Sequence, residues 1–133
     1  METLFYFHTK MHHGIYLLSV LSVVVALIAT VRKQAITGLG LWIIRIYSIV
    51  LTLQVTVGLL QLFMRWSDLG DGLRHRLEHG TLMLVALTMV HLTPRFIRRG
   101  DSVGARNTLL MLVGSLALIL LGVSLIQRAI AGA

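Results

Sequence analysis

Four hydrophobic stretches of near membrane-spanning length follow one another along this 133-residue chain. Two of them, Ile15 to Val31 and Leu109 to Ile126, contain no charged residue and approach the ~20 residues that cross a bilayer core. The other two, Leu39 to Met64 and Gly80 to Leu92, carry polar interruptions or are shorter. Since backbone polar groups find no water in lipid, each stretch must be helical. The sequence therefore predicts an all-α, integral membrane, antiparallel four-helix bundle.

One domain is predicted for residues 1–133, with spans at about 12–31, 39–64, 76–94 and 107–127. The polar segment Trp66 to Gly72 separates the second and third spans, and Pro94, the only proline, is predicted to end the third helix after Thr93. A mean hydropathy of +0.86 with 13% charged residues is typical of a membrane protein. The N-terminal segment lacks the features of a signal peptide, so we expect the first helix to be retained.

The distribution of charge predicts the orientation of the bundle. One predicted side has seven basic residues and one acidic residue, a net charge of +6, whereas the other has five basic and four acidic residues, a net charge of +1. Because cytoplasmic loops are enriched in Lys and Arg, both termini are predicted on the outer, periplasmic side of the bacterial cytoplasmic (inner) membrane. Basicity is then a topology signal, so we expect membrane lipid as a partner and no nucleic acid.

Two histidine clusters stand at the outer ends of the first and third spans: His8, His12 and His13 in one, His75 and His79 in the other. At ~100° per residue, His8 and His12 share a helix face, as do His75 and His79, whereas His13 turns away. The first and third helices of an up-down bundle can lie diagonally, so imidazoles from both can sandwich a porphyrin iron. We therefore predict haem b near the outer side, with one ligand from each cluster.

Other roles of these histidines stay open. The chain has no cysteine, which excludes disulfides, Cys-ligated zinc, iron–sulfur clusters and covalently attached haem. His8, His12, His75 and His79 also suit an outward-facing copper or zinc site. A single histidine beside a span is ordinarily an interfacial residue that hydrogen-bonds to headgroups or water.

The second span carries a polar stripe at helical spacing, formed by Tyr47, Gln54, Gly58, Gln61 and Arg65. In lipid this stripe is predicted to face the bundle interior, because polar side chains there need partners. Gly58 leaves room for a flat macrocycle, and Gln54 or Gln61 can hydrogen-bond to a ligand or to an axial histidine. Close helix packing at Gly58 explains the stripe equally well.

Two polar residues lie nearer the predicted cytoplasmic side. His91 follows His79 by twelve residues, which places it about 120° away around the helix and argues against a second haem. It is predicted to be a structural hydrogen-bonding residue, with a quinone contact as the alternative. Arg45 either snorkels to the surface or marks a second site for an anionic or carbonyl-bearing ligand.

Short motifs in three spans form a wider pattern: Met11 to Gly14, Leu53 to Leu60, and Glu78 to Met83 with Val90-His91. They resemble a group of small bacterial four-helix membrane proteins described as cytochrome b-like. Members begin the first span with His-x-Gly, have Gln-x-x-x-Gly in the second, and have Glu-His followed by another His in the third. The resemblance covers nearly the whole chain and implies His12 and His79 as haem ligands; His91 also belongs to the pattern.

A haem with both axial positions filled is suited to one-electron transfer, here between a membrane quinol and a periplasmic or membrane acceptor. Arg74, Arg76 or Lys10 can offset the haem propionates. The chain is then a redox carrier or a subunit of a membrane redox complex, rather than an independent enzyme, and it has no hydrolytic or nucleotide-binding motif. The alternatives are a haem-free accessory subunit of a larger respiratory or photosynthetic complex, and a copper-, zinc- or quinone-binding membrane protein.

Overall fold

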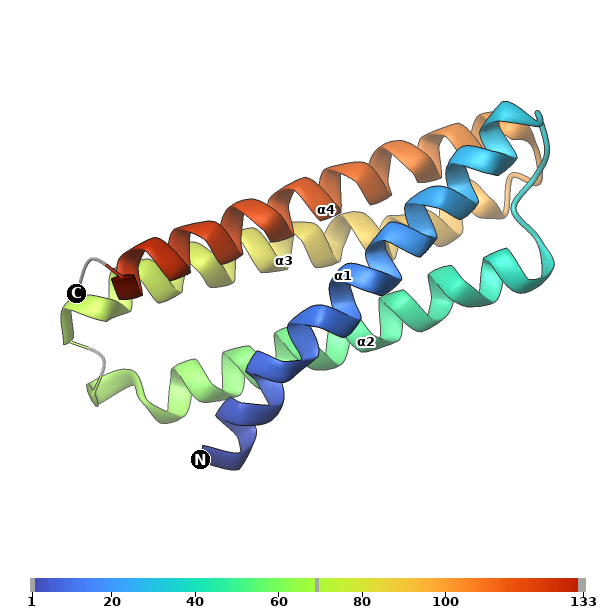
Figure 1. Cartoon of the computed structure of the whole chain (residues 1–133). Helices are drawn as coiled ribbons and strands as arrows, with labels where there is room; N and C mark the ends of the chain where they lie inside the picture. Colours follow the sequence, from blue (N-terminus) through green and yellow to red (C-terminus); the bar gives the residue numbers. More distant parts are fainter. Residues whose placement is uncertain (1, 69, 132–133) are drawn as a thin grey trace.

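The computed structural model describes residues 2–68 and 70–131, and helices make up nearly all of this part of the chain (Figure 1). Four long helices are joined by loops and two short 3-10 turns: α1 (Glu2–Val31), α2 (Gly38–Met64), η1 (Trp66–Asp68), η2 (Gly70–Gly72), α3 (Leu73–Ile97) and α4 (Ser102–Ala131). Each long helix is long and apolar enough to cross a membrane. The predicted all-helical, four-helix architecture is confirmed, and each helix extends beyond the span predicted for it.

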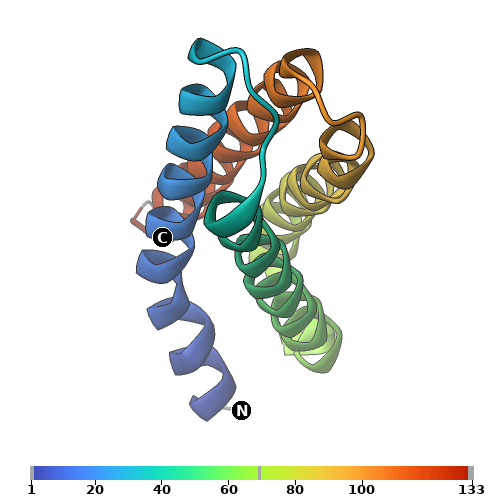
Figure 2. The same ribbon diagram turned by 90° about the vertical axis from the view of Figure 1, so that its right-hand side faces the viewer.

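The four helices form a bundle with two distinct ends (Figures 1 and 2). The start of α1, the η1–η2 connection and the end of α4 lie at one end, here called the terminal end; the α1–α2 and α3–α4 loops lie at the other, the loop end. Helix α1 packs against α2 and α4, and α3 packs against the same two helices. Helices α1 and α3 therefore stand at opposite corners of the bundle.

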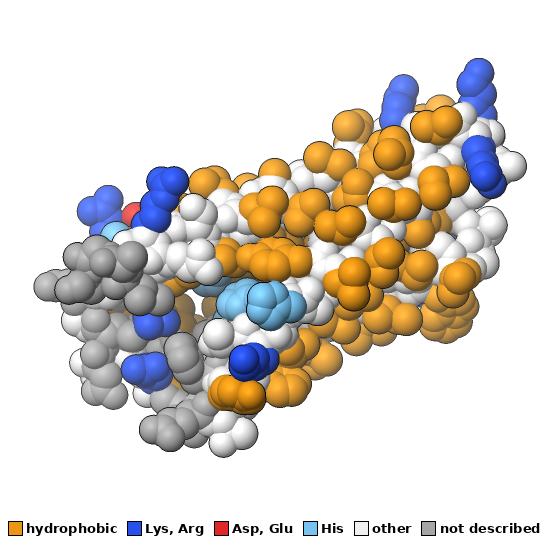
Figure 3. All heavy atoms as spheres, viewed as in Figure 1, with side chains coloured by type: hydrophobic (Ala, Val, Ile, Leu, Met, Phe, Trp, Pro, Cys, Tyr) orange, Lys and Arg blue, Asp and Glu red, His pale blue; other side chains and the backbone are white. Residues whose placement is uncertain are grey.

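Hydrophobic side chains cover the length of the bundle, and basic side chains gather toward its two ends (Figure 3). This distribution matches a helix bundle with an apolar belt between two polar surfaces. Large exposed side chains such as Leu17, Ile49 and Leu110 belong to the belt, with 61%, 60% and 59% of their surface exposed. In water such a surface would be an aggregation hazard, whereas in lipid it is the expected boundary.

Small residues bring the helices close together at the loop end. Ala26 of α1 and Ala105 of α4 are almost completely buried there. A Cβ atom added to Gly40 would lie 2.7 Å from Cγ1 of Val25, and one added to Gly104 would overlap the backbone carbonyl of Phe96. Both glycines are therefore needed for close helix approach, which is the usual role of small residues between membrane helices.

A buried hydrogen bond joins the diagonal helices α2 and α4 at mid-height. The hydroxyl groups of Tyr47 and Ser115 are 3.2 Å apart, and both side chains are completely buried. Because the Ser115 hydroxyl donates to the carbonyl of Leu112 at 2.8 Å, Tyr47 must be the donor to Ser115. Both polar groups are thus satisfied without water, as a site inside an apolar bundle requires.

The predicted end of the third helix at Pro94 is wrong, because α3 continues through Pro94 to Ile97. A proline lacks the N–H that would bond to the carbonyl four residues earlier, here that of Val90. The buried hydroxyl of Thr93 donates to this same carbonyl at 2.7 Å. The side chain replaces the missing backbone donor, so the helix can continue for one more turn.

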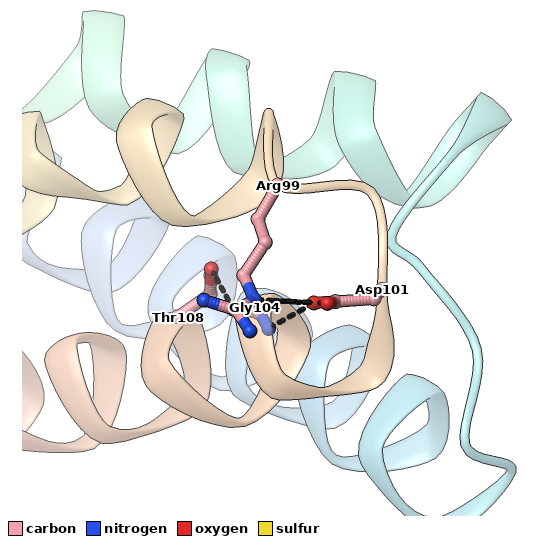
Figure 4. Close-up of polar contacts among 4 residues, drawn as sticks. All are labelled: Arg99, Asp101, Gly104 and Thr108. Carbon is pink, nitrogen blue, oxygen red and sulfur yellow. Dashed lines mark hydrogen bonds and ion pairs between the residues drawn. The ribbon is translucent and has the colours of Figure 1, made fainter.

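The α3–α4 loop ends in a side-chain cap on α4 (Figure 4). Oδ1 of Asp101 accepts a hydrogen bond from the backbone N–H of Gly104 at 2.8 Å, and Nε of Arg99 lies 2.8 Å from Oδ2. An aspartate immediately before a helix satisfies one of the first free N–H groups and complements the positive end of the helix dipole. The sequence between Arg99 and Gly104 therefore specifies where α4 begins.

This cap predicts a loss of stability in acid. The Gly104 hydrogen bond, and then Arg99, lower the pKa of the exposed Asp101 carboxyl below its ordinary value. A group with a lowered folded-state pKa stabilises the fold above its unfolded pKa, about 3.9, and the contribution disappears as the pH falls through the folded pKa. We expect the melting temperature of the wild-type protein in detergent to exceed that of Asp101→Asn above pH 5, and the difference to shrink below about pH 4. A difference that stays constant down to pH 3 would contradict this.

Candidate functional site

A cavity of ≈ 230 Å³ lies toward the terminal end, between all four helices. Its apolar wall comes mainly from Ile15, Leu51, Met83, Ile119 and Val123. Polar side chains from α1, α2 and α3 complete it: His8, His12, Gln54, Gln61, Arg65, Arg76 and His79. Histidine side chains border a hollow on the face of the molecule seen in Figure 3. An apolar cavity with a few convergent polar groups is the usual form of a small-molecule site.

His79 of α3 is held in one orientation by the neighbouring helix α4. Its Nδ1–H donates to the backbone carbonyl of Gly122 at 3.0 Å. A Cβ on Gly122 would lie 3.4 Å from Nδ1 of His79, an ordinary van der Waals contact, and 2.6 Å from Cε of Met83, the end of a flexible side chain. The hydrogen bond leaves Nε2 of His79 available, and an imidazole whose other nitrogen donates to a carbonyl is typical of a metal ligand.

His12 of α1 has the same arrangement of its ring nitrogens. Its Nδ1–H donates to the backbone carbonyl of Thr9 at 2.9 Å. The ring stacks on Tyr16, with centroids 6.4 Å apart and an interplanar angle of 22°. Two imidazoles from opposite corners of the bundle, His12 and His79, thus line one cavity, each with Nδ1 bonded to a carbonyl.

His8 lies one turn before His12 and packs against α2. Its ring makes an edge contact with that of His12, with centroids 5.7 Å apart. Its backbone carbonyl accepts a hydrogen bond from Nε2 of Gln54 at 2.7 Å, and its Cε1 would lie 3.0 Å from a Cβ on Gly58. Gly58 therefore provides the space for a histidine ring.

Three buried polar atoms around the cavity have no hydrogen-bond partner in the described part of the chain: Nδ1 of His8, Oε1 of Gln54 and Nε2 of Gln61. Leaving one such group unsatisfied costs ~1–3 kcal/mol, so native proteins rarely leave several together. Since Gln54 is only 5% exposed, bulk water does not satisfy it. This cluster indicates that the cavity holds a guest with polar groups, or ordered water.

Two arginines, Arg65 of α2 and Arg76 of α3, line the cavity and interact electrostatically with each other. Among the side chains that the structure describes, the lining includes no acidic residue, and Glu78 is paired with Arg74 instead, at 3.1 Å. The two guanidinium groups favour an anionic group on the guest. The cavity thus combines imidazole, amide and guanidinium groups with an apolar wall.

The structure brings together eight of the residues singled out in the sequence. The cavity is lined by His8, His12, Gln54, Gly58, Gln61, Arg65, Arg76 and His79. The predicted inward orientation of the α2 stripe is confirmed, because Tyr47 is fully buried and the other four members line the cavity.

Four other candidates lie elsewhere. His13 and His75 are exposed and do not line the cavity. The guanidinium of Arg45 lies 5.4 Å from the centre of the Trp42 ring, and Nε2 of His91 lies 3.0 Å from the Thr52 hydroxyl. Over the described residues, no three His, Asp or Glu side chains come together as ligands for a metal ion.

Two contributors to the site were not predicted from the sequence. The carbonyl of Gly122 orients His79, and Met83 contributes to the cavity wall and is only 8% exposed. No sequence signal identifies which backbone carbonyl a histidine on another helix will reach. Met83 lies four residues after His79, so the helical repeat could have placed it on the same face.

Comparison of the chain with protein-family models, with curated proteins and with solved structures gives no match. The function has to be inferred from the cavity itself.

Proposed function

We propose that the chain is a four-span protein of the bacterial cytoplasmic membrane, with the terminal end and its cavity on the outer side. The length and apolarity of the four helices support this placement. So does the concentration of basic residues at the loop end, which the positive-inside rule assigns to the cytoplasm: Arg32, Lys33, Arg95, Arg98, Arg99 and Arg106.

We propose further that the cavity binds haem b and that the protein transfers single electrons. One observation carries this proposal: His12 and His79, on opposite helices, line one cavity with Nδ1 bonded to a carbonyl and Nε2 left for a ligand bond. This ligand set is that of a b-type haem, which needs no cysteine. When bound, the haem supplies a one-electron redox couple.

The other lining residues fit the same guest. Arg65 and Arg76 offer donors for propionate carboxylates, and the unpartnered atoms of Gln54 and Gln61 offer an acceptor and a donor at the cavity wall. The volume of ≈ 230 Å³ lies below the ~300–1,000 Å³ of typical ligand pockets. A tetrapyrrole therefore requires the helices to move apart at the terminal end.

The protein's own residues then hold and tune the cofactor rather than react with a substrate. Gly122 fixes the tautomer of His79, and apolar side chains form the wall of the site. With both His12 and His79 holding the haem, the group would supply electron transfer rather than oxygen chemistry. As partners for this carrier we propose other subunits of a membrane redox complex.

The test is optical. We expect the chain, purified in detergent from cells with ample haem, to show a Soret band, a pyridine haemochrome spectrum of haem b and a reduced-minus-oxidised difference spectrum. Haem and protein should be present in equal amounts. A purified, helical protein without haem, including after incubation with added haemin, would overturn the proposal.

A substitution at Gly58 tests the cavity by filling it. A leucine there would occupy the space of the His8 ring, because even a Cβ would lie 3.0 Å from its Cε1. We expect Gly58→Leu to reduce the bound haem at least tenfold while the helical circular dichroism is unchanged. The matched control is Gly14→Leu, since a Cβ at Gly14 meets no atom within 4 Å. Equal haem content in the two variants would argue against this cavity as the site.

A further inference from the structure

A polar surface at mid-height lies on the outside of the bundle, away from the cavity. Thr52 and Thr56 of α2 and Thr88 and His91 of α3 form it, and we call it the His91 face. His91 is exposed, as are Thr56 and Thr88, and Thr52 is half-buried. Nε2 of His91 and the Thr52 hydroxyl, 3.0 Å apart, join the two helices. Since Thr52 stands near the middle of α2 (Gly38–Met64), this face lies at hydrocarbon depth in the proposed membrane.

The hydrogen bonds of Thr52 determine the tautomer of His91. The Thr52 hydroxyl donates its single proton to the carbonyl of Ser48 at 2.7 Å. Toward His91 the Thr52 oxygen must then accept, so the imidazole carries its proton on Nε2. Nδ1 of His91 is consequently an acceptor without a proton, on an exposed side chain.

The two remaining threonines also present only acceptors. The Thr56 hydroxyl donates to the carbonyl of Thr52 at 2.7 Å, and the Thr88 hydroxyl donates to that of Leu84 at 2.8 Å. Arg45, a possible donor, lies seven residues from Thr52, about 10 Å along α2. The His91 face therefore offers acceptors and no side-chain donor, which disfavours a second copy of the same face as its partner.

We propose that the His91 face binds a hydroquinone from the bilayer, with one hydroxyl donating to Nδ1 of His91. A hydroquinone is apolar enough to dissolve in lipid and carries two O–H donors, which complement a face of acceptors. The oxidised quinone has only acceptors, so the face discriminates between the two forms. The role of the hydroquinone as an electron donor to the haem rests on the proposed function, whereas its binding to the His91 face does not.

The test uses the intact protein, with ¹⁵N-labelled histidine, in phosphatidylcholine vesicles. The probe is tetramethylhydroquinone, and the controls are its dimethyl ether and the oxidised tetramethylquinone. We expect the Nδ1 resonance of His91, assigned by its loss in His91→Phe, to shift with the hydroquinone and with neither control. Vesicles with wild-type protein should also retain one hydroquinone per chain above the lipid background. His91→Phe should weaken this retention at least tenfold, and His75→Phe, the same change at an exposed histidine outside the His91 face, should alter it less than twofold.

Three results would overturn the inference: no shift of Nδ1 up to saturation of the vesicles, an equal shift with the dimethyl ether, or an Nδ1 already hydrogen-bonded before the probe is added. The last would indicate a donor from a protein partner, such as another transmembrane helix. Each measurement is made with and without haem. Loss of haem binding with an intact shift contradicts only the proposed function, and loss of the shift in haem-loaded protein contradicts only the hydroquinone site.

Discussion

Replacing His79 by alanine is expected to remove haem b from the protein. The variant loses an imidazole that α4 holds through the Gly122 carbonyl at 3.0 Å. Loss of an outer-shell partner alone costs ~10–100-fold in metal affinity, and loss of the ligand itself should exceed this. We therefore expect haem affinity to fall about 100-fold or more, measured by titration of the Soret band with haemin. His12→Ala should behave in the same way.

The controls lie on the same two helices. His75 is one turn before His79 and His13 is adjacent to His12, yet both are exposed and outside the cavity. His75→Ala and His13→Ala should retain the full spectrum. If His8→Ala abolishes the Soret band while His12→Ala leaves it intact, the ligand on α1 is His8 and the assignment of His12 is wrong.

Replacing Gly104 by alanine is expected to lower the stability of the bundle at a place away from the cavity. A methyl group there would overlap the backbone carbonyl of Phe96, which cannot turn aside as a side chain can. Overpacking of this kind costs ~1–3 kcal/mol, and here it opposes the ~1 kcal/mol that alanine gains over glycine in a helix. The measurement is the free energy of unfolding in mixed micelles of detergent and sodium dodecyl sulfate.

Gly14→Ala makes the same chemical change in α1, where a Cβ meets no atom within 4 Å. We expect its stability to equal or exceed that of the wild-type protein, because only the helix propensity changes. Similar losses in Gly104→Ala and Gly14→Ala would show that the close approach of α3 and α4 at Gly104 does not limit stability.

Much of the fold follows from the sequence because hydrophobic length and charge are local properties. Four apolar stretches, with basic residues between the first and second and between the third and fourth, suffice to predict four helices and their connections. Helical spacing likewise placed His8 and His12 on one face of α1. It placed Gln54 and Gly58 on one face of α2, and all four residues line the cavity.

The remaining features depend on contacts between distant segments. His75 shares a helix face with His79 by spacing, but it stands a turn farther toward the end of the bundle and does not line the cavity. Pro94 was predicted to end a helix, and the Thr93 side chain offsets its missing N–H. Which atom a side chain reaches, such as the Gly122 carbonyl for His79, is set by helix packing and has no local signal.

The unequal ends of the bundle have a consequence for its assembly. Gly40 and Gly104 allow the helices to pack closely at the loop end, whereas the cavity lies toward the terminal end. The closely packed loop end can stay intact while the helices move apart at the terminal end. On the proposed function, we therefore expect the four helices to fold before haem binds, and the haem to enter the bundle at the terminal end.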